Sequence, residues 1–114
     1  MKIPKFEAQT EWVKPTEFPD LRKVDEIAID LETKDPDLLK KGSGSVIGNG
    51  EVIGIAVATK HYKGYFPIAH EGGGNMDRSR VLSWLKDILE STSTKVFHNA
   101  IYDVCWLRSM GFKI

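Results

Sequence analysis

The stretch KVFHNAIYDVCWL, from Lys95 to Leu107, carries the strongest indication of the fold. Its first four residues, 95–98, favour a short strand, and the residues that follow favour a helix running to about Met110. Asn99 is a residue type that caps helix N-termini, and Gly111 is a typical stop signal. The sequence therefore predicts a strand that leads directly into a helix.

Polar residues occupy this junction, where an element that served only the core would be apolar. His98 and Asn99 lie at the turn, and Asp103 follows Asn99 by four residues, which places both on one helix face. A carboxylate near a helix start is also favoured by the helix dipole, so a purely structural Asp103 is the alternative reading. The junction is a candidate functional site.

An earlier stretch, EIAIDLE at about 26–32, is predicted to be the partner strand. Apolar residues recur at helical spacing over 78–90, and Asp77 is placed to cap that helix. A strand, a helix and a strand in succession favour a right-handed crossover, with strands 26–32 and 95–98 parallel and adjacent. Ligand sites in such sheets collect beyond the carboxyl ends of the strands.

The rest of the chain is predicted to support this unit. Two β-rich segments at 51–59 and 61–69 predict an antiparallel hairpin, and the glycine-punctuated segment 34–50 is expected to be a long loop. Residues 1–23 contain three prolines and are expected to form an extended lead-in. Its aromatic side chains are expected to pack on the body of the domain; they are Phe6, Trp12 and Phe18.

Composition limits the classes of protein. A chain of 114 residues with 41% hydrophobic residues has the size of one small globular domain. Sixteen basic and sixteen acidic side chains leave no excess positive charge to attract a polyanion, so metal ions would have to hold phosphates. Cys105 is the single cysteine, which excludes an internal disulfide. With no signal-peptide or membrane-spanning pattern, the expectation is a soluble, cytoplasmic protein without a membrane partner.

Asp30 and Glu32 form a D-x-E pair at the end of the first predicted strand. Residues two apart in a strand share a face, so both carboxylates project together and Leu31 points to the opposite side. Adjacent carboxylates repel unless they are protonated or bridged by a cation, and Mg²⁺ and Mn²⁺ prefer oxygen ligands of this kind. A single D-x-E match also arises by chance, and its alternative is a solvated strand end.

Two segments together resemble a known family. IAIDLET and VFHNAIYD are similar to the first two motifs of the DEDD-type 3′–5′ exonucleases, the proofreading domains of DNA polymerases. TKDP, IGIAVAT and YFPIAHEGGGN resemble phage-type family A polymerases in particular, and the resemblance runs from about Val24 to Ile114. It implies a ribonuclease H-like mixed sheet with flanking helices, truncated at the C-terminus. The implied division is a lead-in at 1–23 and the N-terminal portion of an exonuclease domain at 24–114.

The resemblance also implies site residues, cofactors and partners. The site would hold two divalent cations, Mg²⁺ or Mn²⁺. Asp30 would bind both ions, Glu32 would bind the ion that carries the attacking water, and Asp103 would bind the second ion. The substrate would be a single-stranded DNA 3′ end, and a fused polymerase domain would be the partner. The residues implied to bind substrate are Leu31, Thr33, His98, Asn99 and Tyr102.

The sequence departs from the family pattern after Asp103. The family needs a fourth carboxylate from a third motif, preceded by a Tyr or His, and VCWLRSMGFKI contains no acid. The chain is therefore expected to be a fragment that is inactive alone and that self-associates through its truncated edge. His98 and Asp103 also fit the third-motif spacing H-x4-D, but no other acid before His98 then lies at a strand-to-helix junction.

Other readings remain. A catalytically silent ribonuclease H-like module that binds nucleic acid or protein is the main alternative function, and an unrelated α/β binding domain is the third. TKDPD fails the calcium-loop pattern, and EGGGN lacks the GK[ST] ending of a phosphate loop. His70 is expected at the surface, and Tyr65 is expected to pack or to stack on a base.

Overall fold

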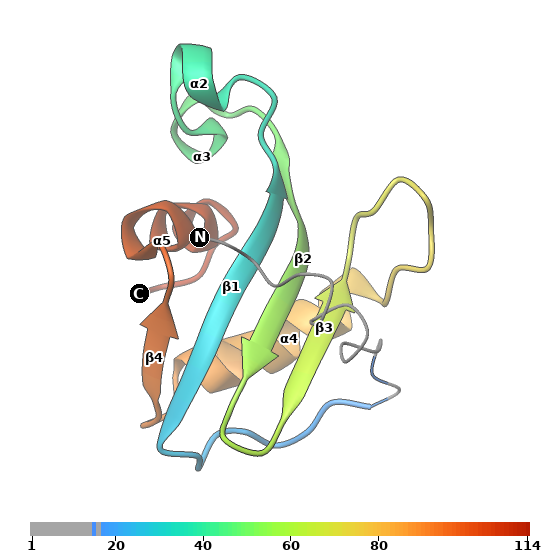
Figure 1. Ribbon diagram of the computed structural model, residues 1–114, viewed down its shortest axis with the longest axis vertical. Helices are drawn as coiled ribbons and strands as arrows, with labels where there is room; N and C mark the ends of the chain where they lie inside the picture. The colour runs from blue at the N-terminus through green and yellow to red at the C-terminus, as the bar shows by residue number, and fades with distance from the viewer. Residues whose placement is uncertain (1–14, 16) are drawn as a thin grey trace.

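The computed structural model describes residue 15 and residues 17–114 of the chain. Within these residues, helices flank one mixed sheet of four strands (Figure 1). The strands are β1 (Glu26–Lys34), β2 (Glu51–Ala58), β3 (Lys63–Pro67) and β4 (Thr94–Phe97). The helices are α2 (Leu38–Lys41), α3 (Gly44–Ile47), α4 (Arg78–Leu89) and α5 (Ala100–Ser109). The predicted α/β class is confirmed, and the arrangement is consistent with a ribonuclease H-like fold.

The strands lie in the order β3-β2-β1-β4. β1 and β2 are antiparallel, as are β2 and β3, which confirms the predicted hairpin. β4 pairs with β1 in parallel, with Ile29 opposite Phe97, so the predicted crossover through α4 is also correct. β1 extends two residues further than predicted, and its register shifts between Glu32 and Thr33.

Strict alternation along β1 separates the core from the site. Ile27, Ile29 and Leu31 are buried, whereas Asp30 and Glu32 lie on the opposite face. α4 lies behind the sheet in the view of Figure 1 and contributes apolar side chains to the same core. Those side chains are Val81, Leu85 and Ile88, and α5 adds Trp106 and Leu107.

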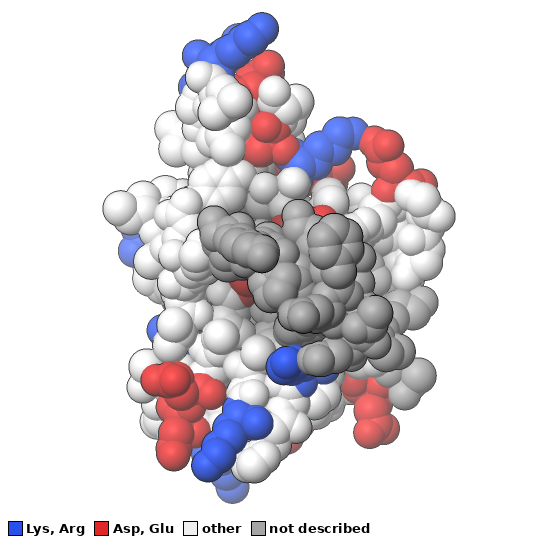
Figure 2. All heavy atoms as spheres, viewed as in Figure 1, with Lys and Arg blue, Asp and Glu red and all other residues white. Residues whose placement is uncertain are grey.

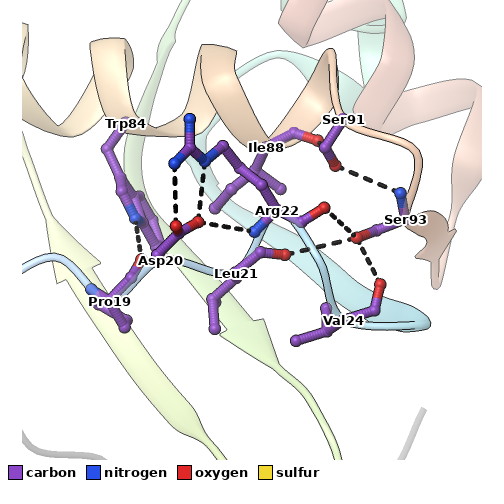
Figure 3. A network of polar contacts seen from close by, with 9 residues as sticks. All are labelled: Pro19, Asp20, Leu21, Arg22, Val24, Trp84, Ile88, Ser91 and Ser93. Carbon is purple, nitrogen blue, oxygen red and sulfur yellow. Dashed lines mark hydrogen bonds and ion pairs between the residues drawn. The ribbon is translucent and has the colours of Figure 1, made fainter.

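The segment before β1 is fixed to the body of the fold. Phe18 stacks on Phe66 with ring centroids 5.8 Å apart, as expected of this aromatic residue. Figure 3 shows the polar contacts beside it: the Trp84 indole donates to the Pro19 carbonyl at 2.7 Å, and the Ser93 hydroxyl lies 2.5 Å from the Val24 carbonyl. The corresponding predictions for Phe6 and Trp12 lie outside the described residues.

The prediction of a plain loop over 34–50 is wrong, because the segment contains α2 and α3. Ser43 caps α3 by accepting a hydrogen bond from the Ser45 amide. The Asp35 carboxylate accepts from the Gly44 amide at 3.0 Å. Both α2 and α3 have only four residues, too few to produce a periodic pattern in the sequence. None of the helices in the described part of the chain is long and apolar enough to cross a membrane.

Candidate functional site

The parallel pairing of β1 with β4 brings the two predicted motifs to one edge of the sheet. Ile29 lies opposite Phe97, so the next residue on each segment, Asp30 and His98, leaves the pairing at the same level. Burial raises the pKa of Asp30, the nearby charge of His98 lowers it, and the charge of Glu32 raises it. These interactions confirm that the D-x-E pair and the strand-to-helix junction are neighbours.

Asp103 enters the same edge from the first turn of α5. Asn99 caps this helix, as predicted, by accepting a hydrogen bond from the Tyr102 amide at 3.5 Å. The Asp103 side chain is only 2% exposed, and its Oδ2 accepts no hydrogen bond from the described part of the chain. Burial and the charge of Asp30 raise the pKa of Asp103 to about 6. A buried carboxylate oxygen without a partner is costly, and it faces a second negative charge.

Glu32 is turned toward β3. Its Oε1 accepts a hydrogen bond from the Tyr65 hydroxyl at 2.6 Å and lies 3.9 Å from the His70 Nε2. Among residues 15 and 17–114, no group of three or more His, Cys, Asp or Glu side chains lies close enough together to hold a metal ion. A site made by Asp30, Glu32 and Asp103 together therefore stays a prediction.

Two of the predicted substrate residues, Thr33 and Tyr102, are hydrogen-bonded to each other. The Tyr102 hydroxyl donates to Asp35 Oδ2 at 2.8 Å and lies 2.8 Å from Thr33 Oγ1, which makes the threonine the second donor. Because Asp35 also accepts from the Gly44 amide, this chain of bonds ties the end of β1 to α5 and to α3. The network fixes α5, and with it Asp103, against the sheet.

The remaining predicted substrate residues differ in their surroundings. His98 and Asn99 are exposed at the edge, although the Asn99 side chain is engaged as the helix cap. Leu31 is 7% exposed and belongs to the hydrophobic core, on the face of β1 opposite the carboxylates. Contact of these residues with a nucleotide stays a prediction.

Asp30 and Asp103 carry oxygen ligands of the kind that hard divalent cations such as Mg²⁺ prefer. Asp103 is buried with an unpartnered oxygen, and burial and the charge of Asp30 raise its pKa, so a divalent cation bound beside it would offset both costs. Figure 2 shows lysine and arginine scattered among acids over the described part of the visible face, without a broad basic surface.

Tyr65 and His70 were not predicted as site residues. His70 was expected at the surface and is instead only partly exposed and in contact with the Tyr65 hydroxyl. The hairpin register carried the relevant signal, because it places Tyr65 opposite Ala56 and Ala56 opposite Asp30 in one row across the sheet. The alternation of the three strands then puts Tyr65 on the carboxylate face.

Comparison with known proteins relates most of the chain to a DNA polymerase. No protein-family model matches the sequence. The chain is 37% identical, over 109 aligned residues and 91% of its length, to a DNA-directed DNA polymerase of Pseudomonas phage M6. It spans 16% of the length of that polymerase. Over most of its length the chain is therefore similar to one part of a phage DNA polymerase.

Proposed function

We propose that this chain is the N-terminal part of a metal-dependent 3′–5′ exonuclease domain that removes nucleotides from DNA 3′ ends and proofreads for a fused polymerase. The similarity to a phage DNA polymerase supports the polymerase context. The observation that carries the metal-dependent chemistry is Asp103, a carboxylate with 2% exposure and an oxygen that accepts no hydrogen bond from the described residues.

The carboxylates would hold the cations in this proposal. Asp30 would be the central ligand because it interacts electrostatically with both Glu32 and Asp103. Bound Mg²⁺ or Mn²⁺ would supply the positive charge that stabilises a phosphodiester under attack. Thr33, Tyr102 and the exposed turn after β4 would contact the single-stranded 3′ end. The chain itself then supplies orientation of the metal ligands and a surface for the terminal nucleotide.

Activity would require further residues. By the family resemblance, a complete site needs a fourth carboxylate, and no acid follows Asp103 in this chain. We therefore expect weak metal binding and little or no cleavage by the 114 residues alone. A reading frame that continues past Ile114 into a Tyr-x3-Asp or His-x4-Asp motif would supply the missing group.

The direct test measures metal binding and nuclease activity on the same preparation. Mn²⁺ binding to the purified chain should weaken strongly in Asp30→Asn and Asp103→Asn, and it should be unchanged in Asp87→Asn, a control on the exposed face of α4. Release of nucleotides from 5′-labelled single-stranded DNA should be absent with or without Mg²⁺. Metal-dependent release by the purified chain would contradict the fragment hypothesis, and Mn²⁺ binding that ignores Asp103→Asn would contradict the site.

A second candidate function is supported by one observation. The described residues hold no group of three or more His, Cys, Asp or Glu side chains placed to hold a metal ion. This geometry would suit a catalytically silent ribonuclease H-like module that binds nucleic acid or a protein. Fluorescence anisotropy with labelled single-stranded DNA separates the two: binding that is equal in EDTA and in Mg²⁺ favours the silent module, and a stop codon directly after Ile114 does the same.

A further inference from the structure

A tyrosine from the outer strand of the hairpin reaches across the sheet to a candidate metal ligand. Tyr65 lies on β3, and its register partner on β2 is Ala56. Its side chain nevertheless extends to β1, two strands away, where the hydroxyl donates to Glu32 Oε1 at 2.6 Å. Burial and this hydrogen bond both raise the pKa of the Tyr65 phenol, so the hydroxyl keeps its proton and remains a donor at neutral pH.

Gly54 makes this reach possible. It lies on β2 directly opposite Glu32, under the path of the tyrosine ring. A Cβ atom at position 54 would lie 1.8 Å from the Tyr65 hydroxyl oxygen and 2.3 Å from the ring carbon that bears it. Any side chain at this position would therefore displace Tyr65 from Glu32. The glycine is required for space on the sheet and not for an unusual backbone conformation, since its φ is not positive.

His70 fixes the direction of the hydroxyl. The Tyr65 oxygen also contacts His70 Nε2, and a hydroxyl that donates to Glu32 can accept a hydrogen bond from that nitrogen. His70 is itself anchored by Asn75, which accepts from the His70 amide at 2.7 Å and donates to its carbonyl at 3.0 Å. The loop after β3 thus fixes the position of His70, the His70 imidazole contacts the Tyr65 hydroxyl, and that hydroxyl donates to the Glu32 carboxylate.

We propose that Tyr65, given room by Gly54 and oriented by His70, is a positioning residue that presents Glu32 to a divalent cation. The inference rests on the proposed function, because it assigns a role to groups around the same metal ligands. A carboxylate has two oxygens, and a hydrogen bond to Oε1 restricts the rotation of the side chain while the second oxygen is left to bind a metal. Hydrogen-bond partners of metal ligands characteristically act in this way, and their loss weakens metal affinity.

The experiment is a Mn²⁺ titration of the 114-residue chain followed by paramagnetic broadening of the amide NMR signals of β1. Tyr65→Phe removes only the hydroxyl. It should weaken the broadening of the amide signals of Asp30 to Thr33, so that about 10-fold to 100-fold more Mn²⁺ is needed for the same effect. Glu32→Gln should weaken it by at least as much. In the Glu32→Gln background, the additional substitution Tyr65→Phe should have no further effect, since the hydroxyl acts through Glu32.

Control variants separate this proposal from the proposed function and from loss of structure. Tyr62→Phe alters another tyrosine of the same hairpin, which packs against the core, and should leave the Mn²⁺ titration unchanged. Absence of broadening in the unsubstituted chain, or broadening that Asp103→Asn leaves unchanged, would refute the metal site itself. Broadening that depends on Asp103 but is equal or stronger in a folded Tyr65→Phe variant would refute the positioning role alone. Folding of each variant is read from the dispersion of the same spectra.

Discussion

Burial of Asp103 on α5 and the charge of Asp30 on β1 together raise the pKa of Asp103 to about 6, although the two residues are 73 positions apart in the sequence. This relationship joins the two sequence motifs through space. It also means that the folded chain holds an electrostatic conflict at neutral pH, because Asp103 is buried and has an oxygen without a hydrogen-bond donor among the described residues.

The first prediction concerns the pH dependence of stability without metal. Because the folded pKa of Asp103 is about 6 and its ordinary value is 3.8, the folded chain binds this proton more tightly than the unfolded chain does. The contribution is fully present below about pH 4, and the free energy of unfolding should fall by roughly 3 kcal/mol as the pH rises through about 6. Urea unfolding in EDTA across this range measures the slope.

The matched control for this prediction is Asp103→Asn, which keeps the shape and removes the titration. Its free energy of unfolding should exceed that of the unsubstituted chain above about pH 6 and approach it below about pH 4. Parallel pH profiles for the two proteins would show that Asp103 does not titrate in this window.

The second prediction is that divalent cations reduce the unfavourable electrostatic energy of Asp103 and thereby stabilise the folded chain. A ligand that binds only the folded chain stabilises it by about 1.4 kcal/mol at tenfold excess over its Kd. Mg²⁺ or Mn²⁺ should therefore raise the melting temperature of the chain at neutral pH, and the increase should be lost in Asp103→Asn and in Asp30→Asn. Asp87→Asn should retain it. An equal increase in all four proteins would indicate a nonspecific ionic effect.

The third prediction concerns the bonds that hold α5 to β1. Tyr102→Phe removes a donor to Asp35 and an acceptor for Thr33, both at 2.8 Å. The loss should lower the free energy of unfolding by about 2 kcal/mol, since one of the two bonds ends on a carboxylate. Urea unfolding of Tyr102→Phe, Asp35→Ala and the double variant should give a coupling energy of at least about 0.5 kcal/mol. Simple additivity would mean that the Tyr102 and Asp35 side chains do not interact in solution.

The regular elements of the fold could be predicted because their signals are local. Alternation placed Asp30 and Glu32 on one face of β1, helical spacing placed α4, and the cap at Asn99 placed the start of α5. The parallel partner of β1 followed from the handedness of the crossover. These rules bring Asp30 and the start of α5 to one edge without any knowledge of side-chain contacts.

The details of the site depend on contacts that no local pattern encodes. Glu32 and Tyr65 meet because Gly54, three residues beyond the start of β2, has no side chain to occupy the sheet surface between them. The first turn of α3 is held by Asp35, which accepts from the Gly44 amide nine residues further along the chain. The first case needs three strands in place at once and the second a side chain that reaches nine residues along the chain, so neither follows from the local pattern of one element.

The fourth prediction tests how tightly the segment after β1 is packed on the strand. Gly48 and Gly50 both have positive φ values, 76° and 81°. A Cβ at position 48 would meet nothing within 4 Å, whereas one at position 50 would lie 2.2 Å from the Lys34 carbonyl oxygen at the end of β1. Alanine at either position pays the cost of the left-handed backbone, roughly 1 to 2 kcal/mol, and only Gly50→Ala adds a backbone collision.

Urea unfolding should therefore rank the two variants, with Gly50→Ala less stable than Gly48→Ala by at least about 1 kcal/mol, because the overlap forces β1 and the α2–α3 segment apart. The amide signals of Lys34, Asp35 and Thr33 should shift in Gly50→Ala and stay in place in Gly48→Ala. Equal stabilities and equal spectra would mean that the α2–α3 segment does not pack on β1 in solution. Asp35 would then not be held in place by this segment for its hydrogen bond with Tyr102 of α5.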